Sequence, residues 1–149
     1  MSTITGKKPE EIVRQLPRLT GSSRLITAEF FKLQPVRSNL QLVTPAQDLD
    51  LCGRELTYWA LKAAMKDHGF DGAHLAEIFH YVQHGLDGKF WNKYAKVAGL
   101  GQTAEEQVRG KILEYVPCLW GTGSIHHVGV KDIRETWTDS DQFLVVTMS

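Results

Sequence analysis

The chain has few cysteines, no excess charge of either sign and no long apolar run. Only Cys52 and Cys118 are cysteines among 149 residues, too few for a disulfide framework. Lys and Arg total 17 and Asp and Glu total 17, so no basic excess drives binding to nucleic acids or membrane surfaces. No segment approaches the roughly 18 apolar residues of a membrane span, and the first residues lack a secretory signal pattern. We therefore expect a soluble protein, cytoplasmic or secreted without a cleaved signal peptide, with no membrane partner.

The length and the apolar content favour one domain with its own core. A typical domain has about 100–150 residues, and 42% of this chain is hydrophobic. The first 23 residues are polar and contain Pro9 and Pro17, which is typical of a weakly organised segment. We expect a leader arm at 1–23 and a single domain at 24–149.

Hydrophobic spacing predicts strands near both ends of the domain and helices between them. Residues 138–141 are turn formers, which would join the last two strands as a hairpin. The predicted fold class is α+β, with the helices segregated from an antiparallel sheet. The predicted segments are a short helix at 10–16, strands at 24–33 and 39–43, helices at 54–68, 71–84, 87–98 and 103–116, and strands at 125–137 and 142–148.

Cys52 directly precedes the strongest helical pattern, although Thr44 and Pro45 offer an earlier helix start. At a helix N-terminus, unpaired N–H groups and the helix dipole favour the thiolate, which is the nucleophilic form of cysteine. Gln47 lies five residues upstream and has a side-chain N–H that could bind an oxyanion. These two residues predict half of a cysteine-based catalytic site.

His126 and His127 begin the strand predicted at 125–137. Successive side chains of a strand point to opposite faces, so only one of these histidines can face the helix behind Cys52. That histidine would act as the base that a nucleophilic cysteine needs.

These features resemble the papain-like cysteine peptidases, in particular a small bacterial branch that includes bacteriocin-leader peptidases. The resemblance covers about residues 47–148. It implies a papain-like fold in which a helix bearing the cysteine packs on a C-terminal antiparallel sheet. The motifs that carry it are Gln47 before Cys52-Gly53, Val116-Pro117 and Gly121-Thr122-Gly123 before the histidine strand, and His126-x-Val128-x-Val130.

The resemblance implies hydrolysis of a peptide or amide bond, or deamidation, without a cofactor or a metal. Cys52 would be the nucleophile, His126 the base and Gln47 the oxyanion donor, with a peptide or protein as substrate. Cell-wall amidopeptidases of the same broad fold use a register that selects His127 instead.

The end of the chain departs from this family. The family places an Asp or Asn after the histidine strand to orient the imidazole, whereas Thr147 and Met148 stand there in this chain. Asp139, Asp141 or Gln142 would substitute, or the site would be a Cys–His dyad. A non-catalytic protein-interaction domain, encoded by a phage or a mobile element, is therefore the alternative function.

Two further alternatives come from the middle of the chain. Glu77, His80 and His84 share one face of a predicted helix, as metal ligands do, and so does a solvated polar stripe. The helices at 71–84 and 87–98 have the order of a helix-turn-helix, but the neutral overall charge argues against a nucleic-acid partner.

The surroundings of two tryptophans and one cysteine can also be predicted from the sequence. Trp120 and Trp137 flank loops and are the tryptophans that we expect to line a cleft. Cys118 lies in an apolar stretch, where a thiol is usually a buried and unreactive group.

Overall fold

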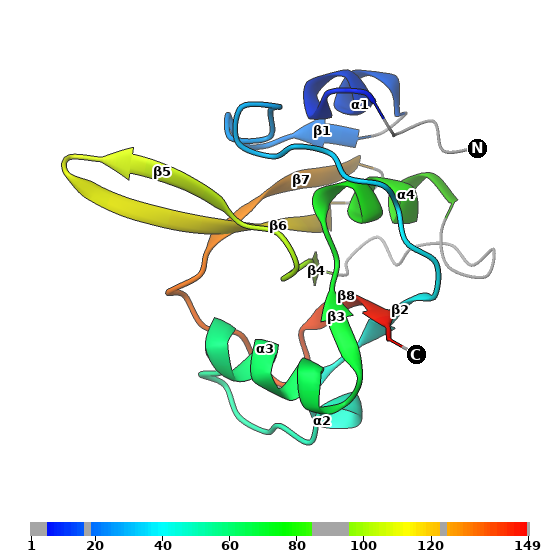
Figure 1. Ribbon diagram of the computed structural model, residues 1–149, viewed down its shortest axis with the longest axis vertical. Helices are drawn as coiled ribbons and strands as arrows, with labels where there is room; N and C mark the ends of the chain where they lie inside the picture. Colours follow the sequence, from blue (N-terminus) through cyan, green and yellow to red (C-terminus); the bar gives the residue numbers. More distant parts are fainter. Residues whose placement is uncertain (1–5, 17–18, 85–95, 123–124, 149) are drawn as a thin grey trace.

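The protein has an α+β fold in which helices cover both faces of one mixed sheet (Figure 1). The computed structural model describes residues 6–16, 19–84, 96–122 and 125–148. The helices are α1 (Pro9–Gln15), α2 (Pro45–Asp48), α3 (Tyr58–Asp67) and α4 (Leu75–His84). The strands are β1 (Leu19–Gly21), β2 (Leu40–Val43), β3 (Phe70–Gly72), β4 (Lys96–Ala98), β5 (Ala104–Val108), β6 (Lys111–Thr122), β7 (Ile125–Asp132) and β8 (Gln142–Thr147).

The sheet is mixed rather than antiparallel, which corrects one part of the predicted architecture. Its order is β1-β7-β6-β4-β8-β2, with β5 paired to β6 and β3 paired to β8. The pairs β1–β7 and β4–β8 are parallel. The predicted hairpin of the last two strands is also wrong, because β7 pairs with β1 and β6 whereas β8 pairs with β2, β3 and β4. The predicted turn at 138–141 does form. The segment that contains it connects β7 to β8, which are not neighbours in the sheet.

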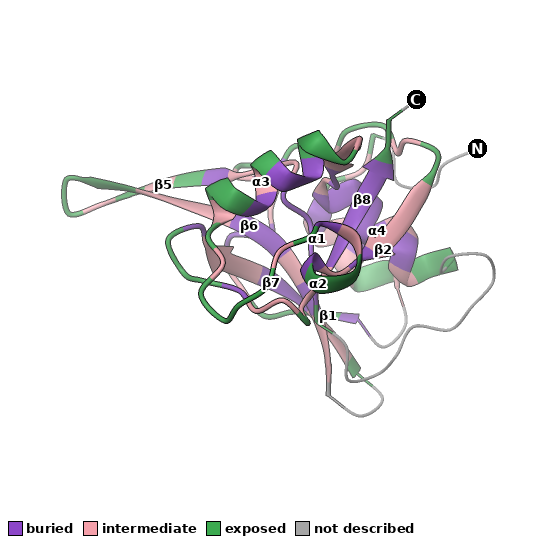
Figure 2. Cartoon of the chain, turned by 90° about the horizontal axis from the view of Figure 1, so that it is seen from below, coloured by how far each residue is buried: buried purple, intermediate pink, exposed green. Residues whose placement is uncertain are grey.

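The two faces of the sheet carry two separate apolar cores. Leu144 packs in the core beneath α1 and α4, whereas Phe143 and Val145 pack in the core beneath α3. This alternation is what a strand buried on both faces requires. Figure 2 shows β8 as a buried strand within the molecule.

Helix α3 begins later than the sequence predicts. The side chain of Thr57 accepts a hydrogen bond from the N–H of Ala60 at 3.1 Å and so caps the helix. At the other end, Gly69 adopts a φ of 78°, which is the left-handed conformation that ends many helices. The predicted stop is confirmed, and the predicted start at residue 54 is wrong.

The predicted helix at 103–116 is wrong, because these residues belong to a β-hairpin. Arg109 and Gly110 both adopt positive φ values, 50° and 78°, as a two-residue turn between twisted strands requires. The helix was predicted because Thr103-Ala104-Glu105-Glu106 has the pattern of a capping box. In the structure, the Glu106 carboxylate forms an ion pair with Arg24 instead.

Three other predicted segments also differ from the structure. Residues 24–33 contain turns but no strand. The segment 71–84 begins with part of β3, and its helix starts only at Leu75. Of the predicted helix at 87–98, residues 96–98 form β4, and the rest lies outside the described residues.

The predicted leader arm is part of the folded domain wherever it is described. Helix α1 buries Ile12, which is 3% exposed, and β1 buries Leu19. Strand β1 pairs with β7, and the N–H of Ser22 donates to the carbonyl oxygen of Val128 at 2.9 Å. No helix within the described ranges is long and apolar enough to cross a membrane.

Candidate binding pocket

Cys52 does not lie at the start of a helix, which corrects the prediction that made it a nucleophile. It is exposed in the connection between α2 and α3, six positions before Tyr58 begins α3. Asp50 and Gly53 turn this connection with φ values of 53° and 131°. The N–H of Gly53 donates to the Asp139 carboxylate at 2.9 Å, which fixes the connection beside the 138–141 turn.

The predicted histidines lie elsewhere in the molecule. His126 is paired with Leu19 of β1 at the start of β7. Figure 1 shows this part of the sheet near α1, far from the connection between α2 and α3. The His127 ring stacks on Trp120 with centroids 5.6 Å apart. The structure therefore does not bring Cys52 together with either histidine.

Gln47 is exposed on the four-residue helix α2. Its backbone N–H donates to the Thr44 hydroxyl at 3.4 Å, so the predicted cap at Thr44 is confirmed. Gln47 and Cys52 belong to the same part of the chain, but neither of the two predicted histidines lies beside them. A histidine that does contact this connection is His68, whose Nε2 lies 3.1 Å from the Asp50 carboxylate.

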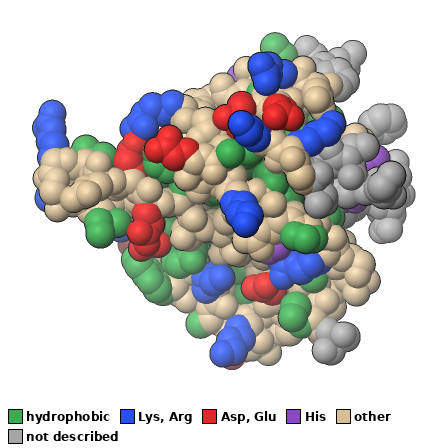
Figure 3. All heavy atoms as spheres, turned by 45° about the horizontal axis from the view of Figure 1, so that its top comes forward, with side chains coloured by type: hydrophobic (Ala, Val, Ile, Leu, Met, Phe, Trp, Pro, Cys, Tyr) green, Lys and Arg blue, Asp and Glu red, His purple; other side chains and the backbone are tan. Residues whose placement is uncertain are grey.

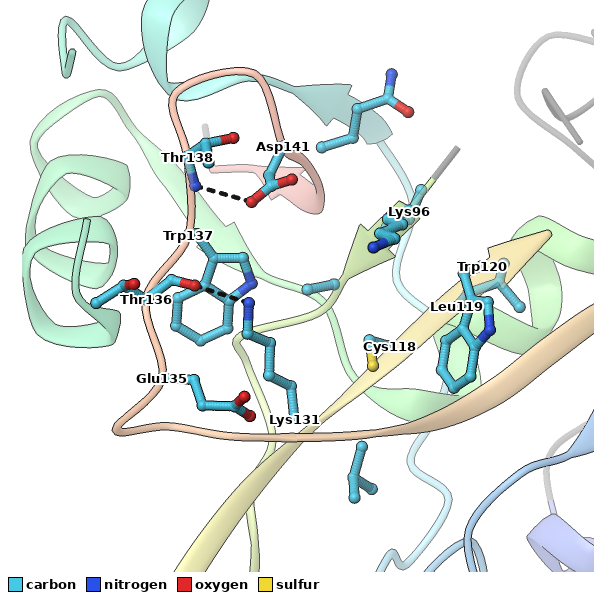
Figure 4. Close-up of a pocket in the computed structure, with 14 residues that line it drawn as sticks. Lys96, Cys118, Leu119, Trp120, Lys131, Glu135, Thr136, Trp137, Thr138 and Asp141 are labelled. Atoms are coloured by element: carbon cyan, nitrogen blue, oxygen red, sulfur yellow. Dashed lines mark hydrogen bonds between the residues drawn. The ribbon is translucent and has the colours of Figure 1, made fainter. Parts of the chain in front are cut away.

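A pocket of about 560 Å³ opens over β4, β6 and β7, beside the 135–142 segment. Figure 4 shows the indole rings of Trp120 and Trp137 on opposite sides of this space, with Cys118 and Lys131 between them. The prediction that these two tryptophans line a cleft is confirmed. The lining residues are Lys96, Val97, Ala98, Cys118, Leu119, Trp120, Val130, Lys131, Glu135, Thr136, Trp137, Thr138, Asp141 and Gln142.

Polar groups of the pocket are held by its own loop. Lys131 Nζ donates to the carbonyl oxygen of Thr136 at 2.8 Å and lies 4.5 Å from the centroid of the Trp137 ring. This cation–π contact fixes both side chains against each other. The Asp141 carboxylate accepts from the N–H of Thr138 at 2.8 Å. Sequence analysis did not predict Lys131 as a pocket residue. The one sequence feature that could have indicated it is its position five residues before Thr136, whose carbonyl oxygen it binds.

The thiol of Cys118 is unsuited to nucleophilic chemistry. Burial raises its pKa to about 12, so the sulfur carries its proton at neutral pH, and the thiolate is the reactive form. This agrees with the predicted unreactive environment of Cys118. Its thiol contributes to the apolar wall of the pocket.

Glu77, the acidic residue of the metal-site alternative, is used for structure. Glu77 is fully buried, and Arg37 donates to both of its carboxylate oxygens at 3.0 and 2.9 Å. Burial acts to raise the pKa of Glu77, but the hydrogen bonds from Arg37 and from the His74 N–H outweigh it, so the pKa is lowered. The rings of His80 and His84 lie 4.7 Å apart. The described part of the chain contains no group of three residues suited to hold a metal ion.

The helix-turn-helix alternative depends on residues 87–95, which lie outside the described ranges, and its last residues form a strand. On the face drawn in Figure 3, acidic and basic side chains are interspersed. The described residues on this face therefore lack a single-sign patch of the kind that binds a phosphate backbone.

Comparison of the chain with protein-family models, with curated proteins and with solved structures gives no match. The functional argument therefore depends on the geometry of the pocket and on the chemistry of its lining.

Proposed function

We propose that this protein is a non-catalytic binding domain that takes an aromatic side chain of a partner protein into the pocket between Trp120 and Trp137. The observation that carries the proposal is an open space of about 560 Å³ flanked by two indole rings. This volume lies within the range of about 300–1,000 Å³ that is usual for ligand pockets.

The lining favours an aromatic group over a charged one. Indole rings attract another ring in offset or edge-on geometry, beyond the gain from buried area. Val97 and Leu119 contribute an apolar floor. Two lysines and two carboxylates lie among the lining residues, so their charges balance. A neutral aromatic side chain on a peptide, whose amides hydrogen-bond at the polar rim, matches this arrangement.

The test is titration with N-acetyl-L-tryptophan amide, followed by two-dimensional NMR of the backbone amides. We expect shifts in β6, β7 and 135–142, and Trp120→Leu should weaken binding about tenfold, which corresponds to about 1.4 kcal/mol. Trp59→Leu is the matched control, because Trp59 is 57% exposed on α3 and does not line the pocket. Equal binding by the Trp120→Leu variant, or shifts confined to other elements, would contradict the proposal.

The second proposal is the papain-like cysteine hydrolase that the sequence resemblance implies. The motif of Gln47 and Cys52 supports it, together with the free, exposed thiol of Cys52. Its catalysis requires the hydrogen bond from Gly53 to Asp139 to break and the connection between α2 and α3 to move toward β7, so that the thiol reaches His126 or His127.

This second proposal is tested in a Cys118→Ala background, where Cys52 is the only thiol. The rate of iodoacetamide alkylation is measured against pH, together with hydrolysis of a casein substrate. A catalytic thiol would alkylate rapidly near neutral pH, and Cys52→Ala would abolish hydrolysis. Alkylation only above about pH 8, as for an unperturbed thiol, with no hydrolysis would reject it.

A further inference from the structure

The β5–β6 hairpin projects from the body of the molecule as a two-stranded ribbon (Figure 1). Strand β7 pairs with β6 only from Tyr115 onward, so the tip of the hairpin extends beyond the rest of the sheet. Within the described ranges, β5 pairs with β6 alone, and its outer edge has no partner strand. Figure 3 shows the same projection at the left of the space-filling view.

Several features of the ribbon would make it unstable, or prone to pair with another strand, if it remained isolated in water. Two-stranded hairpins are marginally stable in water. Glu105 is directly opposite Glu114, and like charges at opposed positions destabilise a strand pair. Ile112 is 66% exposed. The open edge also lacks a proline or a bulge, which are devices that prevent a free edge from pairing with another strand.

The hairpin geometry shows which backbone groups are free. Val108 and Lys111 flank the two-residue turn and are opposed in the ladder, so they exchange hydrogen bonds with each other. Hydrogen-bonded and outward positions alternate along an antiparallel strand. The N–H and C=O groups of Glu105 and Gln107 therefore point outward from β5, where a further strand would bind.

We propose that the outer edge of β5 pairs antiparallel with the same edge of a second copy, forming a symmetric dimer through a four-stranded ribbon. The pairing that we propose places Gln107 opposite Gln107 of the partner subunit. In that register, Glu106 is opposite Val108 of the partner subunit, and Glu105 comes next to the partner's turn, where the partner's Arg109 directly follows the end of β5. This contact between opposite charges occurs twice about the two-fold axis.

Charge selects this register and selects a second copy as the partner. A shift that centres the axis on Glu106 or on Glu105 places identical carboxylates opposite each other, which disfavours pairing. Glu106 is already paired with Arg24 of its own chain. Glu105 and Arg109 have no ion pair within the described residues, so the partner subunit supplies the countercharge that each lacks. A symmetric contact of this kind uses the same patch on both chains.

The experiment is sedimentation equilibrium of the full chain over a range of concentrations, with circular dichroism as a check on folding. We expect a dimer for the wild type. Glu105→Arg and Arg109→Glu should each raise the dimer dissociation constant about tenfold or more, because each places like charges next to each other. The double variant Glu105→Arg/Arg109→Glu should restore the dimer, because it exchanges the two charges. Gln107→Pro should also abolish the dimer by removing an outward N–H.

Lys111→Glu is the matched control, since it reverses a charge at the tip on β6 and not on the pairing edge. It should leave the dissociation constant within about threefold of the wild type. A monomeric wild type at concentrations up to about 1 mM would overturn the proposal. A dimer that both single variants retain, or that the double variant does not restore, would overturn it as well.

Discussion

The two cysteines show how the surroundings of a side chain decide its chemistry. Cys52 precedes a helical pattern in the sequence, but Thr57 caps the helix and leaves Cys52 in an exposed connection. Cys118 lies in the wall of the pocket, where burial raises the pKa of its thiol to about 12.

The raised pKa of Cys118 predicts a loss of stability at alkaline pH. An unfolded cysteine ionises near pH 8.5, whereas the folded protein keeps this proton. The unfolded state therefore binds fewer protons above about pH 9, and the free energy of unfolding falls there by up to about 1.4 kcal/mol per pH unit.

Urea denaturation of the wild type and of Cys118→Ala, between about pH 7 and about pH 11, measures this contribution. The Cys118→Ala variant should lose stability less steeply with rising pH. Burial also raises the pKa values of Tyr58 and Tyr81, and their contribution is common to both proteins. Parallel curves for the two proteins would show that the thiol ionises equally in both states.

At the scale of elements, three glycines let β3 and the 99–101 turn approach closely. A Cβ at Gly101 would overlap the carbonyl oxygen of Gly72, and a Cβ at Gly99 would lie 2.7 Å from the carbonyl oxygen of Ala73. The N–H of Gly101 donates to the same Ala73 oxygen at 3.0 Å. This approach joins the start of α4 to the end of β4.

Gly101→Ala should therefore lower the free energy of unfolding by about 3 kcal/mol, because a backbone neighbour cannot move aside as a side chain does. Gly110→Ala is the comparison. Gly110 has a φ of 78° and open space around its Cβ position, so only the cost of the left-handed conformation applies, about 1 kcal/mol. Chemical denaturation measures both, and similar losses for the two variants would contradict the close approach.

The elements that sequence analysis predicted correctly have local signals. The cap at Thr44, the stop at Gly69 and the apolar run of β8 are each specified by a few neighbouring residues. The segment 103–116 was predicted as a helix because its capping pattern is local, whereas its residues form a hairpin whose second strand continues to Thr122 and pairs with β7 from Tyr115 onward. Such distant contacts leave no trace in the spacing of one segment.

At the scale of the whole molecule, the sequence indicated some members of the pocket but not its assembly. Trp120 and Trp137 were predicted to line a cleft because each flanks a loop. The lysines and carboxylates of the pocket come from β4, β7 and the 135–142 segment, and only the sheet order brings these together. For the same reason, no spacing rule reveals that Cys52 and His126 lie in different parts of the molecule.

Residues of the predicted leader arm should contribute to the stability of the whole domain. Ile12 is 3% exposed within the core beneath α1 and α4. Ile12→Ala should therefore lower the free energy of unfolding by about 2–5 kcal/mol. Arg14→Ala, at an exposed position of the same helix, should change it by no more than about 0.5 kcal/mol. Equal, small changes in the free energy of unfolding of the two variants, measured by urea denaturation, would mean that α1 does not stabilise the domain.

The order of the sheet has a consequence for synthesis on the ribosome. Strands β1 and β2 precede the other described strands, yet they occupy the two outer positions of the sheet, and their partners β7 and β8 follow about 100 residues later. Among the described residues, β1 and β2 therefore find their partner strands only after β7 and β8 have left the ribosome. Pairing across such separations is slow, and apolar residues such as Leu19 and Val43 remain open to chaperones during that interval.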